Sequence, residues 1–269
     1  MKMGRYAAAL AACMAICALL LAAGCTTTEE ETTITVFTAG SLKGSFTEIA
    51  TAYEDDHPGT EVVLNIDGTQ ALRTQVEQGA RGDVFVSANQ KHMDALMGEG
   101  FMDNATVVDF VENRVTVALP ASNPGTIADL SGLTKAGTKV LIGTPDVPIG
   151  SYAREVLESM AADPAYGEAY RDAVLANVVS EETNVNNIIA KLLIGEADAG
   201  FTYTSDVVTP AYADQLTTIT IPDEYNVVAR YPIGALRESA HPDTANEFIA
   251  FVRSEEGGII LSSYGFTPI

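Results

Sequence analysis

Four short turns in this sequence combine glycine or hydroxyl residues with the start of a helical pattern, and such turns can bind anions. They are residues 39–41 (AGS), 67–69 (DGT), 147–151 (VPIGS) and 182–185 (ETNV). The first backbone N–H groups of a helix have no acceptor within the helix, and they lie at the positive end of its dipole. Tetrahedral oxyanions bind at such helix ends without a cationic side chain. A single turn of this kind predicts an ordinary helix cap, whereas four favour a shared ligand cleft.

Residue patterns typical of catalysis are absent from the sequence. It has no G-x-S-x-G nucleophile elbow, no Walker loop, no G-x-G-x-x-G and no H-E-x-x-H. The three histidines, His57, His92 and His241, each stand among polar or turn-forming neighbours, so we expect them at the surface. We therefore expect no enzyme activity and no cofactor.

The elements that must position the four turns alternate between strand and helix patterns. Strands are expected at residues 33–37, 61–66, 83–87, 114–119, 139–143, 200–203, 217–221 and 226–231. Helices are expected after residue 41 and at 70–78, 151–160, 185–194 and 242–253, the last of these being the final helix. This alternation predicts an α/β fold of two lobes, each a mostly parallel sheet flanked by helices, with the ligand cleft between them.

Composition narrows the function further. The chain has 269 residues, enough for one large or two medium domains, and 15 Lys+Arg against 36 Asp+Glu give a formal net charge of -21. Such an acidic surface repels phosphate backbones, so we expect no nucleic-acid partner, and we expect a monomer. An anion site in this chain must act at contact range through oriented N–H and O–H groups rather than through net charge.

The first 24 residues are expected to be an export signal. Lys2 and Arg5 precede an uninterrupted small and apolar stretch at residues 7–23, and residues 21–25 (LAAGC) resemble the lipobox of secreted lipoproteins. We therefore expect Cys25 to carry a lipid at the outer face of the cytoplasmic membrane, with residues 25–32 as a tether. The alternative is a retained membrane anchor. All three cysteines lie at or before residue 25, so no disulfide is expected in the folded body.

Five segments carry a family resemblance: 34–42 (ITVFTAGSL), 82–89 (GDVFVSAN), 145–153 (PDVPIGSYA), 195–206 (GEADAGFTYTSD) and 264–267 (YGFT). From about residue 34 to residue 269 the chain resembles the molybdate-binding proteins of ABC importers, within the two-lobed periplasmic-binding-protein superfamily, type II. The resemblance implies hinge closure around a ligand. We place lobe 1 at residues 33–113 plus 232–269 and lobe 2 at residues 114–231.

The resemblance also implies an oxyanion site made of neutral donors. Its hydroxyl-plus-amide positions fall on Ser41 and Thr69, its backbone amide positions on Ile149 and Val185, and its phenol on Tyr203. These residues would reach the metal only through the oxygens of molybdate. For Tyr203 the alternative is a tyrosine of the core below the cleft.

Asp67 places a carboxylate two residues before Thr69. One expectation is that it faces solvent or caps the next helix. The other, by similarity to tungstate-binding relatives, is that it coordinates the metal. Molybdate and tungstate are fully deprotonated dianions near neutral pH, so a site made only of donors suits either. Selection against sulfate would then depend mainly on the size of the site.

The resemblance thus implies a lipoprotein that captures molybdate or tungstate outside the cytoplasm and delivers it to an ABC permease with its ATPase. Three alternatives stay open from the residues alone. They are a binding protein for sulfate, phosphate or ferric ion, an anchored hydrolase, and a sensor that uses the same fold without transport.

Overall fold

The computed structural model describes residues 31–212 and 214–269. The predicted export signal, Cys25 with its predicted lipid, and tether residues 25–30 lie outside the described residues. Residues Thr32–Ile269 form one compact unit. In the described part of the chain, no helix combines the length and the apolar character that a membrane span requires.

Strands and helices alternate in the first part of the chain. The elements are β1 (Thr32–Ala39), η1 (Gly40–Leu42), α2 (Lys43–Asp56), β2 (Thr60–Asp67), α3 (Thr69–Glu77), β3 (Val84–Val86) and α4 (Gln90–Glu99). β1 pairs in parallel with both β2 and β3. Its last residue, Ala39, lies opposite Asp67, the last residue of β2. This register places the turns at 39–41 and 67–69 side by side.

The middle of the chain repeats this arrangement. Its elements are β4 (Val108–Pro120), η2 (Leu130–Thr134), β5 (Val140–Gly143), α5 (Pro148–Ala162), α6 (Gly167–Ala176), β6 (Val178–Glu182), α7 (Val185–Leu193), β7 (Ala199–Tyr203), α8 (Thr204–Val208) and β8 (Leu216–Thr220). β5 pairs in parallel with β6 and β7. Gly143 lies opposite Glu182, so the turns that follow β5 and β6 also leave the sheet together.

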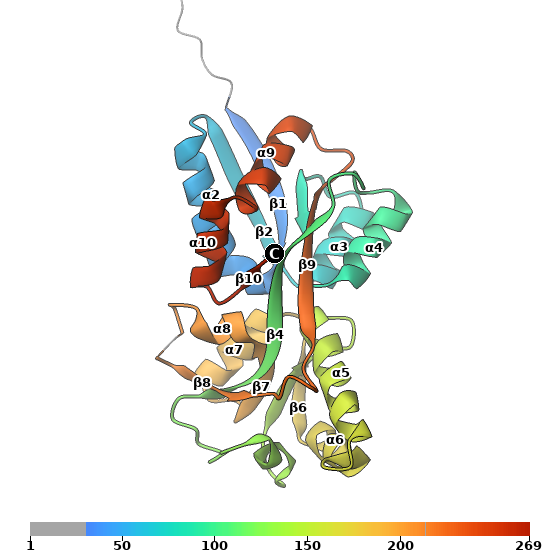
Figure 1. Ribbon diagram of the computed structural model, residues 1–269, viewed down its shortest axis with the longest axis vertical. Helices are drawn as coiled ribbons and strands as arrows, with labels where there is room; N and C mark the ends of the chain where they lie inside the picture. The colour runs from blue at the N-terminus through green and yellow to red at the C-terminus, as the bar shows by residue number, and fades with distance from the viewer. Residues whose placement is uncertain (1–30, 213) are drawn as a thin grey trace, which may run out of the picture. The chain divides into compact units, whose positions relative to one another are not determined.

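Two long strands connect the lobes. The last elements are β9 (Val228–Ala235), α9 (Pro242–Val252), α10 (Glu255–Ser263) and β10 (Thr267–Pro268). β4 pairs antiparallel with β9 up to Arg114, and from Val115 onward with β7 and β8. Figure 1 shows β4 and β9 running between the upper group of helices and the lower one. The two-lobed α/β fold is thus confirmed, while the lobe boundaries at 113/114 and 231/232 stay a prediction.

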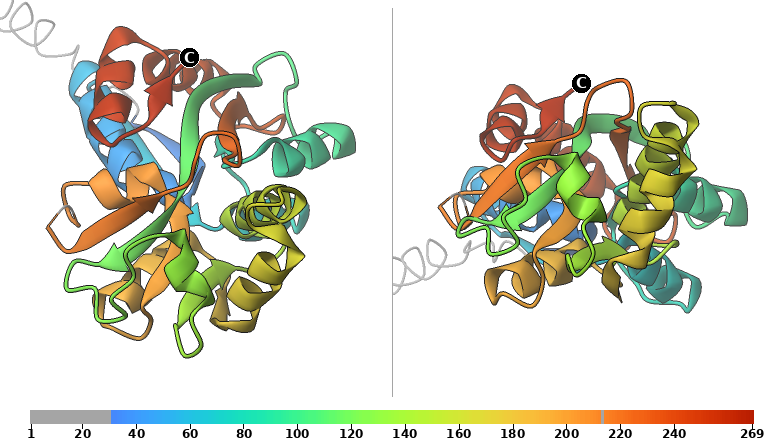
Figure 2. Two further views of the ribbon diagram at one scale, coloured as in Figure 1. Left: turned by 60° about the horizontal axis from the view of Figure 1, so that its bottom comes forward. Right: turned by 90° about the horizontal axis from the view of Figure 1, so that it is seen from below.

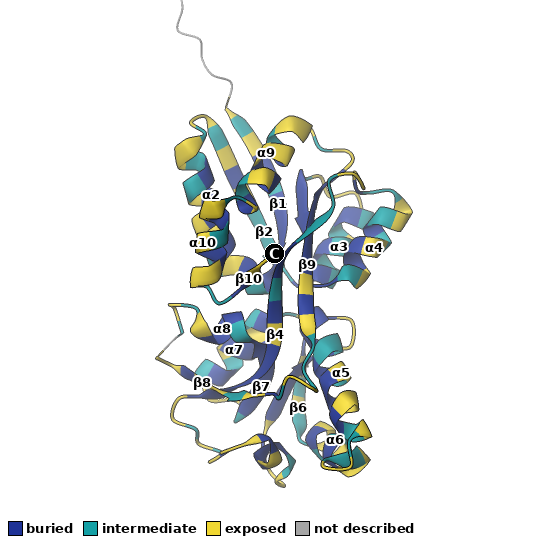
Figure 3. Cartoon of the chain, in the orientation of Figure 1, coloured by how far each residue is buried: buried dark blue, intermediate teal, exposed yellow. Residues whose placement is uncertain are grey.

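The strands form one path in the order β2-β1-β3-β9-β4-β7-β5-β6, with β8 and β10 each pairing with β4. The parallel strands β3, β5 and β7 are buried along their whole length, as expected where helices cover both faces of a sheet. Figure 2 shows helices on both sides of the strands, and Figure 3 shows β7 in the dark blue of buried residues.

Several elements differ from the predicted ones. The helix at 242–253 was predicted to be the last one. In the structure it corresponds to α9, and a further helix, α10, follows at Glu255–Ser263. Its Gly257-Gly258 pair gives a weak helix signal, but Ser254 caps the helix by accepting a hydrogen bond from the Gly257 N–H at 3.2 Å. β4 begins six residues before the predicted strand at 114–119, because its first half pairs with β9.

The predicted surface position of His92 is wrong. His92 lies on the inner face of α4 with 1% of its surface exposed, and its Nε2 lies 2.9 Å from the carbonyl oxygen of Asp146. Burial lowers the pKa of the imidazole, so the ring is neutral at physiological pH. Its polar neighbours in sequence, Lys91 and Asp94, point outward from the same helix, and so they did not indicate burial.

Candidate functional site

One small cavity of about 20 Å³ brings together the ends of the four predicted turns. Its lining residues are Ala39, Gly40, Ser41, Gly68, Thr69, Ala88, Val147, Pro148, Ile149, Asn184, Val185 and Tyr203. All five residues predicted to bind the oxyanion are among them. Their contact with a ligand stays a prediction, but the convergence that this prediction requires is present.

The sheet explains this convergence. Ser41 lies just beyond the carboxyl end of β1, and Thr69 just beyond that of β2. In the other lobe, Ile149 follows β5 and Val185 follows β6. Tyr203 is the last residue of β7. In open α/β sheets, ligands bind outside the carboxyl ends of the strands, where the chain turns into the helices. Residues far apart in the sequence therefore meet because of parallel pairing.

The helix caps leave particular amides for a ligand. At α5, Val147 provides no side-chain cap, and Pro148 has no N–H, so Ile149 carries the first backbone donor of the helix. At α7, the Asn184 Oδ1 accepts from the Asn186 N–H at 2.9 Å. This cap satisfies the second amide of the helix and leaves the first, that of Val185, a residue that lines the cavity.

The hydroxyl of Thr69 is held as a donor. Thr69 is 1% exposed, and its Oγ1 accepts a hydrogen bond from the Ala88 N–H at 3.1 Å. A backbone N–H can only donate, so the hydroxyl hydrogen of Thr69 remains available for an acceptor in the cavity. Ser41 is half-buried, and its Oγ lies 3.0 Å from the hydroxyl of Tyr231.

Tyr203 combines a core position with an unsatisfied hydroxyl. Its ring packs edge-to-face against Tyr152 and Tyr231, at centroid distances of 6.5 and 5.9 Å. Its hydroxyl, however, is buried and has no hydrogen-bond partner among residues 31–212 and 214–269. Burial raises the pKa of the phenol well above its usual range, so it remains a donor at neutral pH. Since Tyr203 lines the cavity, this hydroxyl is able to donate to an acceptor placed there.

No side chain of Asp, Glu, Lys, Arg or His is among the residues that line the cavity. Asp67 lies outside the lining, and its Oδ1 accepts from the Gly68 N–H at 2.7 Å and from the Asn184 Nδ2 at 3.0 Å. Below the cavity, the buried Asp206 accepts from the Tyr203 N–H at 2.9 Å, and burial raises the pKa of its carboxyl to about 7.

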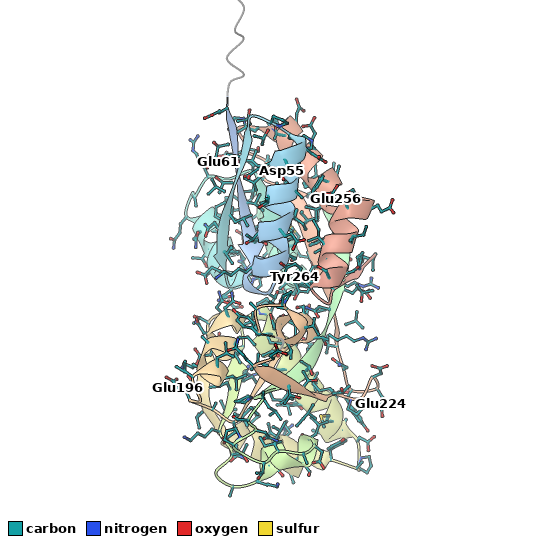
Figure 4. The ribbon with its side chains drawn as sticks, turned by 90° about the vertical axis from the view of Figure 1, so that its left-hand side faces the viewer. Asp55, Glu61, Glu196, Glu224, Glu256 and Tyr264 are labelled. Carbon is teal, nitrogen blue, oxygen red and sulfur yellow. The ribbon has the colours of Figure 1, made fainter. Side chains whose placement is uncertain are left out.

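The acidic residues that dominate the composition lie elsewhere. Figure 4 shows Asp55, Glu61 and Glu256 projecting outward from the upper lobe, and Glu196 and Glu224 from the lower lobe. All five are exposed. The net negative charge is therefore a property of the surface, and the cavity itself is neutral.

Two residues that line the cavity were not predicted as site residues from the sequence. Ala88 contributes the amide that orients Thr69, but an alanine after a short strand carries no signal of that role. Asn184 was predicted only as part of a turn, and its N-cap pattern was readable from the sequence. Its bond to Asp67 depends on packing between segments 117 residues apart.

Two lobes joined by paired strands, with a small neutral cavity at the carboxyl ends of strands from both lobes, define a solute-binding protein. The chain belongs to the family of bacterial extracellular solute-binding proteins, whose family model matches residues 34–267.

Known relatives agree with this assignment. A molybdate-binding protein of Mycobacterium tuberculosis is 32% identical over 239 residues, which cover 89% of this chain and 86% of that protein. A Bacillus subtilis protein, provisionally named an ABC transporter substrate-binding lipoprotein, is 27% identical over 94% of this chain and 95% of its own. The solved periplasmic molybdate-binding protein of Azotobacter vinelandii has the same fold, with a TM-score of 0.75, 20% identity, and coverage of 87% of this chain and 98% of that one. The resemblance read from the sequence motifs is thus confirmed.

Proposed function

We propose that this protein captures molybdate outside the cytoplasm and delivers it to an ABC importer. The observation that carries the proposal is the donor-only character of the cavity. Two hydroxyls, helix-terminal amides and a buried phenol that has no partner in the part of the chain that the structure describes converge there, and no carboxylate is among the lining residues. A fully deprotonated dianion can accept from every one of these donors.

Each predicted residue has a defined part in this proposal. Ser41 and Thr69 donate through their hydroxyls and backbone amides, Ile149 and Val185 through their amides, and Tyr203 through its phenol. The protein reaches the metal only through the oxygens of the anion. Molybdate and tungstate share charge and shape, so the proposal covers both, and the ion is cargo rather than a cofactor.

The energetics are sufficient for tight binding. A hydrogen bond to a charged group contributes about 1.5 to 3 kcal/mol, and five or more converge here, against the costs of desolvation and lobe closure. The cavity of about 20 Å³ is much smaller than the roughly 300 to 1,000 Å³ typical of sites for drug-sized ligands. It therefore favours a small tetrahedral ion over a larger organic acid.

Titration calorimetry of the purified protein with molybdate, tungstate, sulfate and phosphate tests the proposal. We expect binding of the two metal oxyanions at least tenfold tighter than that of sulfate or phosphate, a difference of about 1.4 kcal/mol or more. Thr69→Ala should weaken molybdate binding about tenfold, since it removes one charge-assisted donor. Thr74→Ala, on the exposed face of the same helix, is the matched control.

Sulfate is the second candidate ligand, because it is also a deprotonated tetrahedral dianion and a donor-only cavity suits it equally. The two differ in the distance from the central atom to its oxygens. Sulfate affinity equal to or above that of molybdate in the same titration would replace the first assignment with the second.

The proposal extends to the location and partners of the protein. It places a lipid on Cys25, anchors the chain at the outer face of the cytoplasmic membrane, and gives it a permease and ATPase as partners, acting as a monomer with no catalytic step. The name of the Bacillus subtilis relative supports the anchor. Cys25→Ser should release the protein from the membrane fraction, whereas unchanged fractionation would argue against lipidation.

A further inference from the structure

A chain of buried hydrogen bonds lies behind Ser41, outside the five predicted site residues. The side-chain amide of Asn113 donates from Nδ2 to the Ser205 Oγ at 2.7 Å and to the Tyr231 hydroxyl at 3.5 Å. The Tyr231 hydroxyl in turn lies 3.0 Å from the Ser41 Oγ. Asn113 belongs to β4 and Tyr231 to β9, the two strands that connect the lobes.

The orientation of the Asn113 amide is determined by the backbone. Its Oδ1 accepts a hydrogen bond from the Arg114 N–H at 2.9 Å. Because a backbone N–H can only donate, the side-chain atom that faces it must be the amide oxygen and not the NH₂ group. The NH₂ group of Asn113 must therefore face the two hydroxyls. Asn113 is only 3% exposed, so its amide is largely shielded from bulk water.

The direction of the next bond follows. The Tyr231 oxygen faces an NH₂ group and accepts from it, so its own hydrogen must be donated elsewhere. Among the described residues, the remaining hydrogen-bond partner of this hydroxyl is the Ser41 Oγ. Tyr231 is 0% exposed, and burial raises the pKa of its phenol far above the physiological range, so the hydrogen is present at every working pH.

Ser41 is consequently an acceptor toward Tyr231 and must donate its own hydrogen in another direction. Ser41 lines the cavity, where an anion would take that hydrogen. The Ala88 N–H likewise occupies an acceptor position of the Thr69 hydroxyl and leaves its hydrogen to be donated. One hydroxyl is thus oriented by a backbone amide and the other by a phenol that is itself oriented by an asparagine.

We propose that Tyr231 is a positioning residue that holds the Ser41 hydroxyl as a donor, so that the site prefers a fully deprotonated oxyanion to a protonated one such as hydrogen phosphate. The inference rests on the proposed function. A serine hydroxyl without this constraint can also accept, and it could then pair with the P–OH of phosphate. With Tyr231 in place, one of the two lone pairs of the Ser41 oxygen is already occupied, so the hydroxyl has fewer acceptor positions to offer that P–OH.

A double-mutant cycle tests this role. Molybdate affinity is measured by calorimetry for wild type, Ser41→Ala, Tyr231→Phe and the double variant. We expect Tyr231→Phe to weaken binding about three- to tenfold, and the double variant to bind no more weakly than Ser41→Ala alone. Losses that multiply in the double variant would show that Tyr231 acts independently of Ser41 and would overturn the inference.

Phosphate competition against bound molybdate provides the second readout. Tyr231→Phe should lower the molybdate affinity more than the phosphate affinity, so that the ratio of the two constants falls about threefold or more. A role of Tyr231 in packing alone would weaken both anions by the same factor and leave the ratio unchanged. An unchanged ratio would therefore contradict the proposal.

Matched variants separate this inference from general effects on folding. Tyr53→Phe removes another fully buried hydroxyl, one that has no hydrogen-bond partner among the described residues, and should leave molybdate affinity unchanged. If Tyr231→Phe does not fold, Asn113→Ala provides the test, because it removes the donor that orients Tyr231, and its effect should likewise vanish in the Ser41→Ala background. Wild-type protein that binds no oxyanion would refute the proposed function, whereas molybdate binding with multiplicative losses would refute only the inference.

Discussion

The carboxylate of Asp67 accepts a hydrogen bond from the side-chain amide of Asn184, with 3.0 Å between Oδ1 and Nδ2. Asp67 ends β2 just before α3, and Asn184 caps α7. One bond therefore joins two helix N-termini that supply donors to the cavity, one from each lobe. The neighbouring Gln70 Nε2 donates to the Thr183 carbonyl at 2.7 Å and links the same two turns.

Asp67→Ala should speed the release of molybdate about tenfold, because it removes a bond between the lobes that must break when the cleft opens. Stopped-flow dissociation measures this rate. Asp67→Asn keeps an oxygen that can accept from Asn184 and removes only the charge, so its dissociation rate should remain near that of wild type. Equal rates for wild type and the alanine variant would show that the bond does not hold the lobes.

Gly40→Ala should weaken molybdate binding about tenfold while leaving the stability of the ligand-free protein nearly unchanged. A Cβ at Gly40 would lie 2.5 Å from the Asn184 Oδ1 and 3.0 Å from the Asn186 Nδ2. These atoms belong to the other lobe, so the added methyl would hold the lobes apart. Calorimetry and thermal unfolding measure the two effects. Gly98→Ala, which would meet nothing within 4 Å, should not alter affinity.

Tyr203→Phe should stabilise the ligand-free protein and weaken its binding of molybdate. The hydroxyl is buried without a partner in the described part of the chain, and an unsatisfied buried polar group costs about 1 to 3 kcal/mol. Thermal unfolding without ligand and calorimetry with molybdate test the two directions. Tyr53→Phe should stabilise the protein similarly and bind normally. A loss of stability in Tyr203→Phe would indicate a role in the core instead.

Asp206→Asn should change how stability depends on pH. Burial raises the pKa of this carboxyl from 3.8 to about 7. Between these pH values the folded protein holds a proton that the unfolded chain releases. The contribution of Asp206 to the free energy of unfolding is therefore fully present below the pKa of the unfolded chain and is lost as pH rises through about 7. Urea unfolding at about pH 5 and about pH 8 should therefore show a larger relative gain for the variant at the higher pH. A constant difference would be inconsistent with this titration.

Association of molybdate should become faster as ionic strength rises. The chain carries a formal net charge of -21, and its exposed acidic residues repel an approaching anion over distances that salt screens. Stopped-flow association at increasing sodium chloride measures the effect. An association rate that falls with salt would mean that a local positive field, not the net charge, guides the ion.

Residues that end helices or form turns explain why much of the fold was predictable from the sequence. The pattern at 57–59, His-Pro-Gly, ends α2 at Asp56, and Gly79 follows α3 with a positive φ of 91°. The four turns were readable for the same reason, since a polar or glycine residue before an apolar helical pattern marks a helix N-terminus. Parallel pairing then brings such turns to one edge of the sheet without further information from side chains.

Contacts between distant segments were not predictable in the same way. The burial of His92 depends on the carbonyl of Asp146, and the donor state of Ser41 depends on Tyr231, 190 residues away. In the sequence, Tyr231 is an aromatic residue in a strand, and nothing local distinguishes a phenol that orients a ligand donor from one that only packs.

The sequence by itself therefore determined the α/β alternation, the helix ends and the residues able to donate at them, because these depend on neighbours within a few positions. Only the tertiary structure decided which hydroxyls are held as donors, which side chains join the two lobes, and that an acidic chain encloses a neutral cavity. Hydrophobic periodicity determines which face of an element is buried, but it does not determine which distant residue that face will meet.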